Sequence, residues 1–97
     1  METVNWQAPD GVEFEWDPAK AALNLRKHGI SFPYATRVFL DSHRLERFDT
    51  REEYGEDRWV VLGRVDDFVL VVVYTLRGSD IRLISARKAD RNDYGIF

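Results

Sequence analysis

The chain contains no cysteine, few prolines, and no apolar run near the ~20 residues that a membrane-spanning helix needs. The lack of cysteine excludes disulfides and thiolate metal sites. Residues 1–11 are acidic and polar, unlike a signal peptide. We therefore expect a cytoplasmic protein with no membrane association.

The length and composition are those of a small folded protein. A chain of 97 residues can bury one hydrophobic core but not two. Apolar residues make up 44% and charged residues 32%, which argues against disorder. We expect residues 1–11 to be a flexible lead-in and residues 12–97 to form a single domain.

The net charge of −3 argues against a non-specific nucleic-acid binder, which normally needs clustered cations. The charge is unevenly distributed, however. Residues 41–57 hold seven acids and three arginines, whereas residues 77–91 hold five cations and two acids. A positive carboxyl-terminal strip therefore follows an acidic middle, and the local field governs how a charged ligand is steered.

Two helices are predicted in the first half of the chain. Asp17-Pro18 is typical of an N-cap followed by proline in the first turn, and Gly29 is a matching stop, so the first helix spans about residues 18–28. Ser31 can cap a second helix, which ends near Leu40-Asp41.

Strands are predicted elsewhere. A short strand covers residues 12–16, and four more cover residues 43–48, 58–65, 68–76 and 81–88. The links Asp66-Asp67 and Gly78-Ser79 are too short for parallel crossovers. We expect an α+β fold in which an antiparallel sheet of about four strands carries two N-terminal helices on one face, with residues 69–74 in its central strand.

The two short turns predict a register. A turn at Gly78-Ser79 places Thr75 opposite Arg82 and Val73 opposite Ile84. A turn at Asp66-Asp67 adds further pairs across the sheet: Val65 with Phe68, Leu62 with Val71, Val60 with Val73, and Arg58 with Thr75. The predicted result is an arginine row, which we define as Arg58, Thr75 and Arg82 side by side with Arg77 one step along.

The arginine row has two interpretations. Guanidinium groups repel one another unless an anion joins them, and phosphate fits their bidentate geometry. Alternatively, acids from residues 41–57, such as Glu56 or Asp49, neutralise the arginines in a structural ion network, which is the commoner situation. Arg87 and Lys88 fall on opposite faces of their strand, so at most one can join the row.

The chain offers little other chemistry. His28 and His43 lack metal-ligand spacing, and there is no glycine-rich phosphate loop or nucleophile elbow, so we expect no metal and no cofactor. Lys27 and His28 form a possible proton-transfer pair if the end of their helix lies over the arginine row.

The sequence resembles the BrnT toxin family over about residues 14–89. The resemblance rests on an ordered string of motifs: Phe14-Glu15-Trp16-Asp17-Pro18, Lys20, Asn24, Lys27-His28-Gly29-Ile30-Ser31-Phe32, Tyr54-Gly55-Glu56, Arg58, Gly63, Val73-Tyr74-Thr75, Arg77 and the run from Ile81 to Ala89. It implies a RelE-like fold, a ribonuclease that arrests translation, and a BrnA-like antitoxin, expected as a heterotetramer, through which alone operator DNA is bound.

The resemblance also implies a mechanism, namely metal-free cleavage of RNA by attack of a ribose 2′-hydroxyl on the adjacent phosphorus. Such a reaction needs cations for the developing charge and groups that move protons. The roles that follow are charge stabilisation by Arg58, Arg77 and Arg82, acid or base work by Glu56, Lys27 or His28, and substrate contact by Thr75, Arg87 and Lys88. The choice of base stays open at this point.

Two alternatives belong to other functional classes. A catalytically inactive toxin-like module would keep the fold and bind only its antitoxin partner, and it would not arrest growth when expressed alone. A plain nucleic-acid-binding domain would bind RNA tightly without cutting it, which the acidic net charge disfavours.

Overall fold

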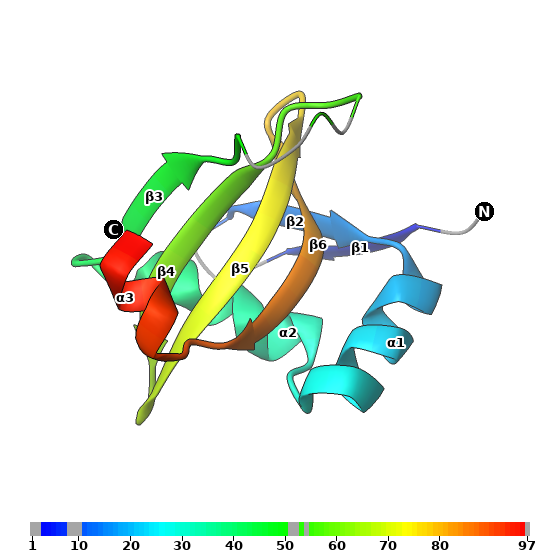
Figure 1. The fold of residues 1–97 in the computed structure, drawn as a ribbon. Helices are drawn as coiled ribbons and strands as arrows, with labels where there is room; N and C mark the ends of the chain where they lie inside the picture. Colours follow the sequence, from blue (N-terminus) through cyan, green and yellow to red (C-terminus); the bar gives the residue numbers. More distant parts are fainter. Residues whose placement is uncertain (1–2, 8–10, 51–52, 54, 97) are drawn as a thin grey trace.

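The computed structural model describes residues 3–7, 11–50, 53 and 55–96. In this part of the chain a six-stranded sheet has the order β1-β2-β6-β5-β4-β3 and carries helices on both faces (Figure 1). Its elements are β1 (Val4–Gln7), β2 (Glu13–Trp16), α1 (Pro18–His28), α2 (Phe32–Ala35), the 3₁₀ helix η1 (Thr36–Leu40), β3 (Leu45–Phe48), β4 (Trp59–Val65), β5 (Phe68–Arg77), β6 (Asp80–Lys88) and α3 (Arg91–Ile96).

The two predicted helices are present. The Asp17 side chain accepts a hydrogen bond from the Ala19 amide at 2.9 Å, and Gly29 ends α1 in the left-handed conformation with φ of 72°. The second helix begins after Ser31 as expected, but it is α-helical only through Ala35 and continues as η1. The Thr36 hydroxyl donates to the Pro33 carbonyl at 2.6 Å, a local side-chain bond of the kind that competes with regular helix.

The α+β class is confirmed, but the four-stranded antiparallel sheet is wrong in detail. Residues Val4–Gln7, within the segment expected to be a lead-in, form β1 against β2. β2 in turn pairs in parallel with β6, through Phe14 with Ile81 and Glu15 with Arg82. A parallel pair so distant in sequence has no turn signature, so local patterns did not indicate it. The helix α3 was also not predicted.

Asn24 on α1 completes the edge of β6 beyond the end of β2. Its side-chain amide donates to the Ala86 carbonyl at 2.8 Å and accepts from the Ala86 amide at 3.0 Å. It also donates to the Ile30 carbonyl at 3.0 Å. This buried side chain therefore takes the place of a strand partner and attaches α1 to the sheet.

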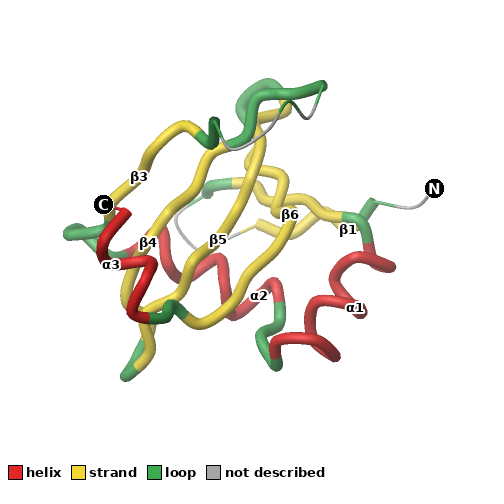
Figure 2. The backbone as a smooth tube through the Cα atoms, viewed as in Figure 1, coloured by secondary structure: helices red, strands yellow, loops and turns green. Residues whose placement is uncertain are grey.

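The sheet has a hydrophobic cluster on each side. Against α2 and η1 lies the larger cluster, which we call the helix face, with Phe14, Trp16, Phe32, Ala35, Val38, Val61, Val72, Tyr74, Leu83 and Ala86 among its members. The other side, the α3 face, has a smaller cluster of Val60, Leu62, Val71 and Val73. Figure 2 shows α3 in front of the sheet and α2 behind it. β5 is buried from Leu70 to Thr75, which confirms it as the central strand.

The predicted register holds at both turns and fails in the middle of β6. Thr75 lies opposite Arg82, and Val60 opposite Val73, as predicted. Val73, however, faces Ser85 and not Ile84, because the register shifts between Val73 and Tyr74. The shift is a β-bulge that lets Ile84 pack against the cluster on the α3 face.

Gly63 in β4 lies directly under η1. A Cβ atom at this position would overlap Cγ2 of Val38 and lie 3.1 Å from the Val38 carbonyl oxygen. The close approach of η1 to the sheet therefore requires glycine here.

We predict that Gly63→Ala lowers the free energy of unfolding by about 1–3 kcal/mol, the usual range for overpacking a core. Denaturant unfolding measures the change. In a Val38→Ala background the penalty should shrink, because the overlapping methyl group is gone. An equal penalty in both backgrounds would contradict the steric explanation.

Candidate active site

The arginine row lies on the α3 face at one end of the sheet. Thr75 alternates with Val71 and Val73 along β5, so it projects to the same side as they do. Arg82 is its direct partner on β6. Arg58 immediately precedes the first pair between β4 and β5.

Glu56 lies between two arginines of the row. Its Oε2 is 3.5 Å from Nε of Arg58, and its Oε1 is 3.6 Å from a terminal nitrogen of Arg77. The Glu56 side chain is 30% exposed and that of Arg77 is 54% exposed. Pairs of this length and exposure are weak. The carboxylate and the Arg77 guanidinium therefore lie on a surface that solvent and ligands can reach, with the 23% exposed Arg58 side chain half-buried beside them.

Arg82 is paired differently. Its terminal nitrogen is 2.8 Å from Oε2 of Glu15, and the two side chains are 15% and 14% exposed. The sequence suggested an acid from residues 41–57 as the neutralising group, whereas the acid here comes from β2. This short, largely buried pair fits the structural interpretation of the row at Arg82.

Thr75 is 3% exposed, and its hydroxyl donates to the Asp57 carbonyl at 2.5 Å. The segment between β3 and β4 is also held by the Asp49 amide, which donates to the Arg58 carbonyl at 2.8 Å. The loop that carries Glu56 is thus attached to the sheet close to the arginine row. The sequence did not indicate that the Asp57 carbonyl would bind Thr75, because every residue type carries a backbone carbonyl.

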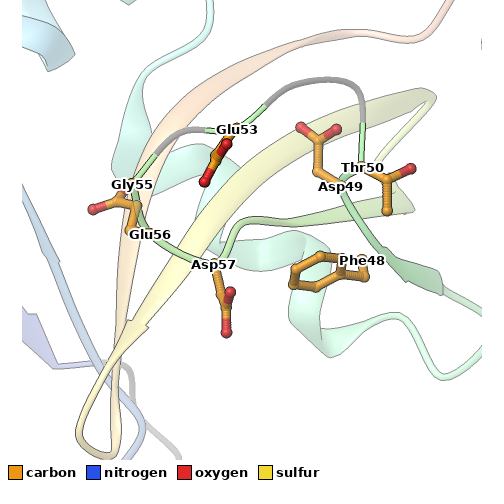
Figure 3. Close-up of a pocket in the computed structure, with 7 residues that line it drawn as sticks. All are labelled: Phe48, Asp49, Thr50, Glu53, Gly55, Glu56 and Asp57. Carbon is orange, nitrogen blue, oxygen red and sulfur yellow. The ribbon is translucent and has the colours of Figure 1, made fainter.

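This loop borders a pocket of about 580 Å³ (Figure 3). The lining residues are Phe48, Asp49, Thr50, Glu53, Gly55, Glu56 and Asp57. Four of these seven described residues are acidic, and their carboxylates disfavour a phosphate beside them. A phosphate is better accommodated on the other side of Glu56, where Arg58 and Arg77 lie.

The structure does not bring Lys27 and His28 into the row. Both lie at the end of α1, which is attached to β6 through Asn24 on the side of Ala86. Within the described part of the chain, neither side chain forms a hydrogen bond or ion pair with Glu56, the carboxylate of the row. Of the three acid or base candidates, Glu56 is the one in contact with these cations.

Arg87 and Lys88 lie on opposite faces of β6, as predicted, and outside the row. Arg87 is opposite Val71, four residues from Thr75 and thus roughly 13 Å along the strand. Lys88 is opposite Leu70, with Nζ 4.4 Å from the centroid of the Phe68 ring.

Tyr74 projects away from the row into the helix face. Its hydroxyl donates to Oε1 of Glu46 at 2.7 Å. Burial, together with this hydrogen bond, raises the pKa of Tyr74 well above its ordinary value. Tyr74 therefore stays protonated, and its hydroxyl lies on the side of the sheet away from the arginine row.

Arg87 anchors α3 through Asp93. Both terminal nitrogens of Arg87 donate to the buried Asp93 carboxylate at 2.7 Å, and the Asp90 amide donates to it at 2.6 Å. The Arg87 hydrogen bonds lower the pKa of Asp93 from 3.8 to about 2. Sequence patterns did not indicate this pair.

The sign of this shift predicts a pH dependence. Because the folded pKa lies below the unfolded value, the carboxylate stabilises the fold above about pH 4, and this stability, roughly 2 kcal/mol, is lost as pH falls toward 2. Asp93→Asn should lower the melting temperature at pH 7 and remove this part of the acid dependence. Thermal unfolding between pH 2 and 7 measures it, with the exposed turn variant Asp67→Asn as control. An acid dependence in Asp93→Asn equal to that of the parent would argue against the pair.

The geometry defines a class of protein. Glu56 lies between the exposed Arg77 and the half-buried Arg58. In such a group the carboxylate can accept a proton and the guanidinium groups can stabilise an anionic phosphoryl group. Among the described residues, no cluster of three or more histidine or acidic side chains could hold a metal ion. The chain is thus a small α+β protein with a candidate site for phosphate chemistry on its sheet.

Comparison with known families makes this assignment specific. The family model described as the ribonuclease toxin BrnT of type II toxin-antitoxin systems matches residues 16–93. The chain belongs to this family, which confirms the resemblance seen in the sequence. Membership implies a ribonuclease toxin with an antitoxin partner. A search of curated proteins gives no match. No helix in the described ranges is long and apolar enough to cross a membrane.

Proposed function

We propose that this protein cleaves RNA without a metal ion and thereby arrests translation. The observation that carries the proposal is the position of Glu56 between Arg58 and Arg77. Family membership supports the ribonuclease activity, and the pairing of one carboxylate with two cations supports the chemistry.

In the proposed reaction the ribose 2′-hydroxyl forms a bond to the adjacent phosphorus while the bond to the 5′-oxygen breaks. Glu56 accepts the proton of the attacking hydroxyl. Arg58 and Arg77 stabilise the charge that develops on the phosphoryl oxygens. The leaving 5′-oxygen takes up a proton from solvent at the exposed side of Arg77.

Arg82 is the third cation of the proposed site. Its short pair with Glu15 already neutralises much of its charge, so its contribution to the rate is smaller than that of Arg58 or Arg77. Lys27, His28, Arg87 and Lys88 stay outside the reaction, because none of them contacts the Glu56 pair.

The partner that we propose is a BrnA-like antitoxin in a heterotetramer, with operator DNA bound through the antitoxin alone. Membership of a type II family supports a partner that neutralises the toxin. The exposed Arg77 and the half-buried Arg58 favour a covering segment that brings carboxylates and apolar contacts. Such a segment would block phosphate from the same surface.

One observation favours a second function. Each arginine of the row has a carboxylate partner within the chain, either Glu56 or Glu15. A catalytically inactive module that only binds its antitoxin would keep such a network for stability. It predicts no RNA cleavage and no growth arrest when the chain is expressed alone.

The test is RNA cleavage by the purified chain in excess chelator. We predict cleavage of an all-ribose substrate and none of a substrate with a 2′-deoxy sugar at the mapped cut. Glu56→Gln and Arg77→Ala should each lower the rate by about 10²-fold or more, the usual cost of losing one positioned catalytic group. Lys88→Ala, a cation outside the row, is the matched control and should cleave like the parent.

Two results would overturn the proposal. One is a requirement for magnesium, and the other is full activity of Glu56→Gln. A parent chain that neither cleaves RNA nor arrests growth supports the inactive module.

A further inference from the structure

We infer that Thr75 is a positioning residue, which holds the loop before β4 so that Glu56 stays between Arg58 and Arg77. The inference rests on the proposed function, since it assigns a role in placing the base of that reaction. The family resemblance suggested that Thr75 contacts the substrate directly, and we propose the positioning role in place of that contact.

The first step is that the Thr75 hydroxyl is already engaged. The side chain is 3% exposed, and its proton is donated to the Asp57 carbonyl. A buried hydroxyl with its donor directed at a backbone oxygen is not presented to a ligand on the surface. Its hydrogen bond instead joins the central strand β5 to the loop.

The second step is that this bond acts next to Glu56. Asp57 is the following residue, so a fixed Asp57 carbonyl restricts where the Glu56 side chain can begin. The contacts of Glu56 with Arg58 and Arg77 are 3.5 and 3.6 Å long and partly exposed, which makes them too weak to set its position alone. The shorter bond to a buried residue of β5 supplies that constraint.

The third step is the rigidity of the anchor. Thr75 continues the buried run of β5 and is paired with Arg82 on the neighbouring strand. The loop is therefore fixed to the buried part of the central strand β5. Reacting groups need such support, because a misplacement of about 1 Å can cost up to about 10²-fold in rate.

The test uses two substitutions of Thr75 in the full-length chain. Thr75→Val keeps the shape of the side chain and removes the hydroxyl, whereas Thr75→Ser keeps the hydroxyl. We expect Thr75→Val to lower kcat for RNA cleavage by about tenfold or more with little change in KM. The acid limb of its pH–rate profile should also move, and Thr75→Ser should restore both properties.

A second measurement is independent of activity. Hydrogen–deuterium exchange of the backbone amides in residues 55–58 should be faster in Thr75→Val than in the parent and close to the parent in Thr75→Ser. Exchange in α1, which packs against β6, is the internal control. If valine leaves exchange in the loop unchanged, or leaves kcat unchanged in an active enzyme, the positioning role is wrong.

The cleavage assay and the exchange measurement together distinguish a failure of this inference from a failure of the proposed function. A parent chain that cleaves no RNA refutes the proposed function and, with it, the claim that Thr75 positions a catalytic base. The exchange result then shows whether the hydroxyl holds the loop at all. An active parent with an equally active Thr75→Val variant refutes the positioning role alone.

Discussion

The central constraint on this structure is that β5 is buried on both faces. From Leu70 to Thr75 every side chain is shielded from solvent, so each side of the strand needs a covering layer. The helix face is covered by α2 and η1, which approach closely over Gly63. Among the described residues, the α3 face has the six-residue helix α3 as its only helix. Partly buried arginine side chains also lie on this face, Arg87 against α3 and Arg82 toward the other end of β6. Arginine suits this place because its stem is apolar and its end is charged.

Covering a sheet with arginines requires counter-charges, and three carboxylates of the described residues, Asp93, Glu15 and Glu56, hold their arginine partners with different strength. Asp93 holds Arg87 at 2.7 Å, and Glu15 holds Arg82 at 2.8 Å. Glu56 lies 3.5 Å or more from both of its arginines and is more exposed. The loosest part of the network therefore coincides with the candidate active site, where a phosphate can compete for Arg58 and Arg77. The short pairs keep α3 and β2 in place.

Local signals predicted the parts of the fold that depend on neighbouring residues. The caps at Asp17 and Gly29 bounded α1, and the turns at Asp66 and Gly78 set the register that places Thr75 opposite Arg82. The sequence also indicated the family, because several spaced motifs together are more specific than any one of them.

The features that sequence reasoning missed are non-local or lack a residue-type signal. The contact between Arg82 and Glu15 depends on the parallel pairing of β2 with β6. The two residues are 67 positions apart in the sequence, and no turn sequence indicates that their strands pair. The bulge at Ile84 of β6, where the register shifts between Val73 and Tyr74, contains no glycine that could have indicated it. The choice of Glu56 over Lys27 and His28 needed the three-dimensional positions of a loop and a helix end.

The central claim is that phosphate binds at Arg58 and Arg77 on the α3 face. The most direct measurement is an NMR titration of the labelled chain with a short 2′-deoxy oligonucleotide, which binds without being cut. The account predicts that the largest changes occur in the side-chain signals of Arg58 and Arg77 and in the backbone amides of Glu56 and Asp57. Largest changes on α1, at Lys20, Arg26 and Lys27, would contradict it.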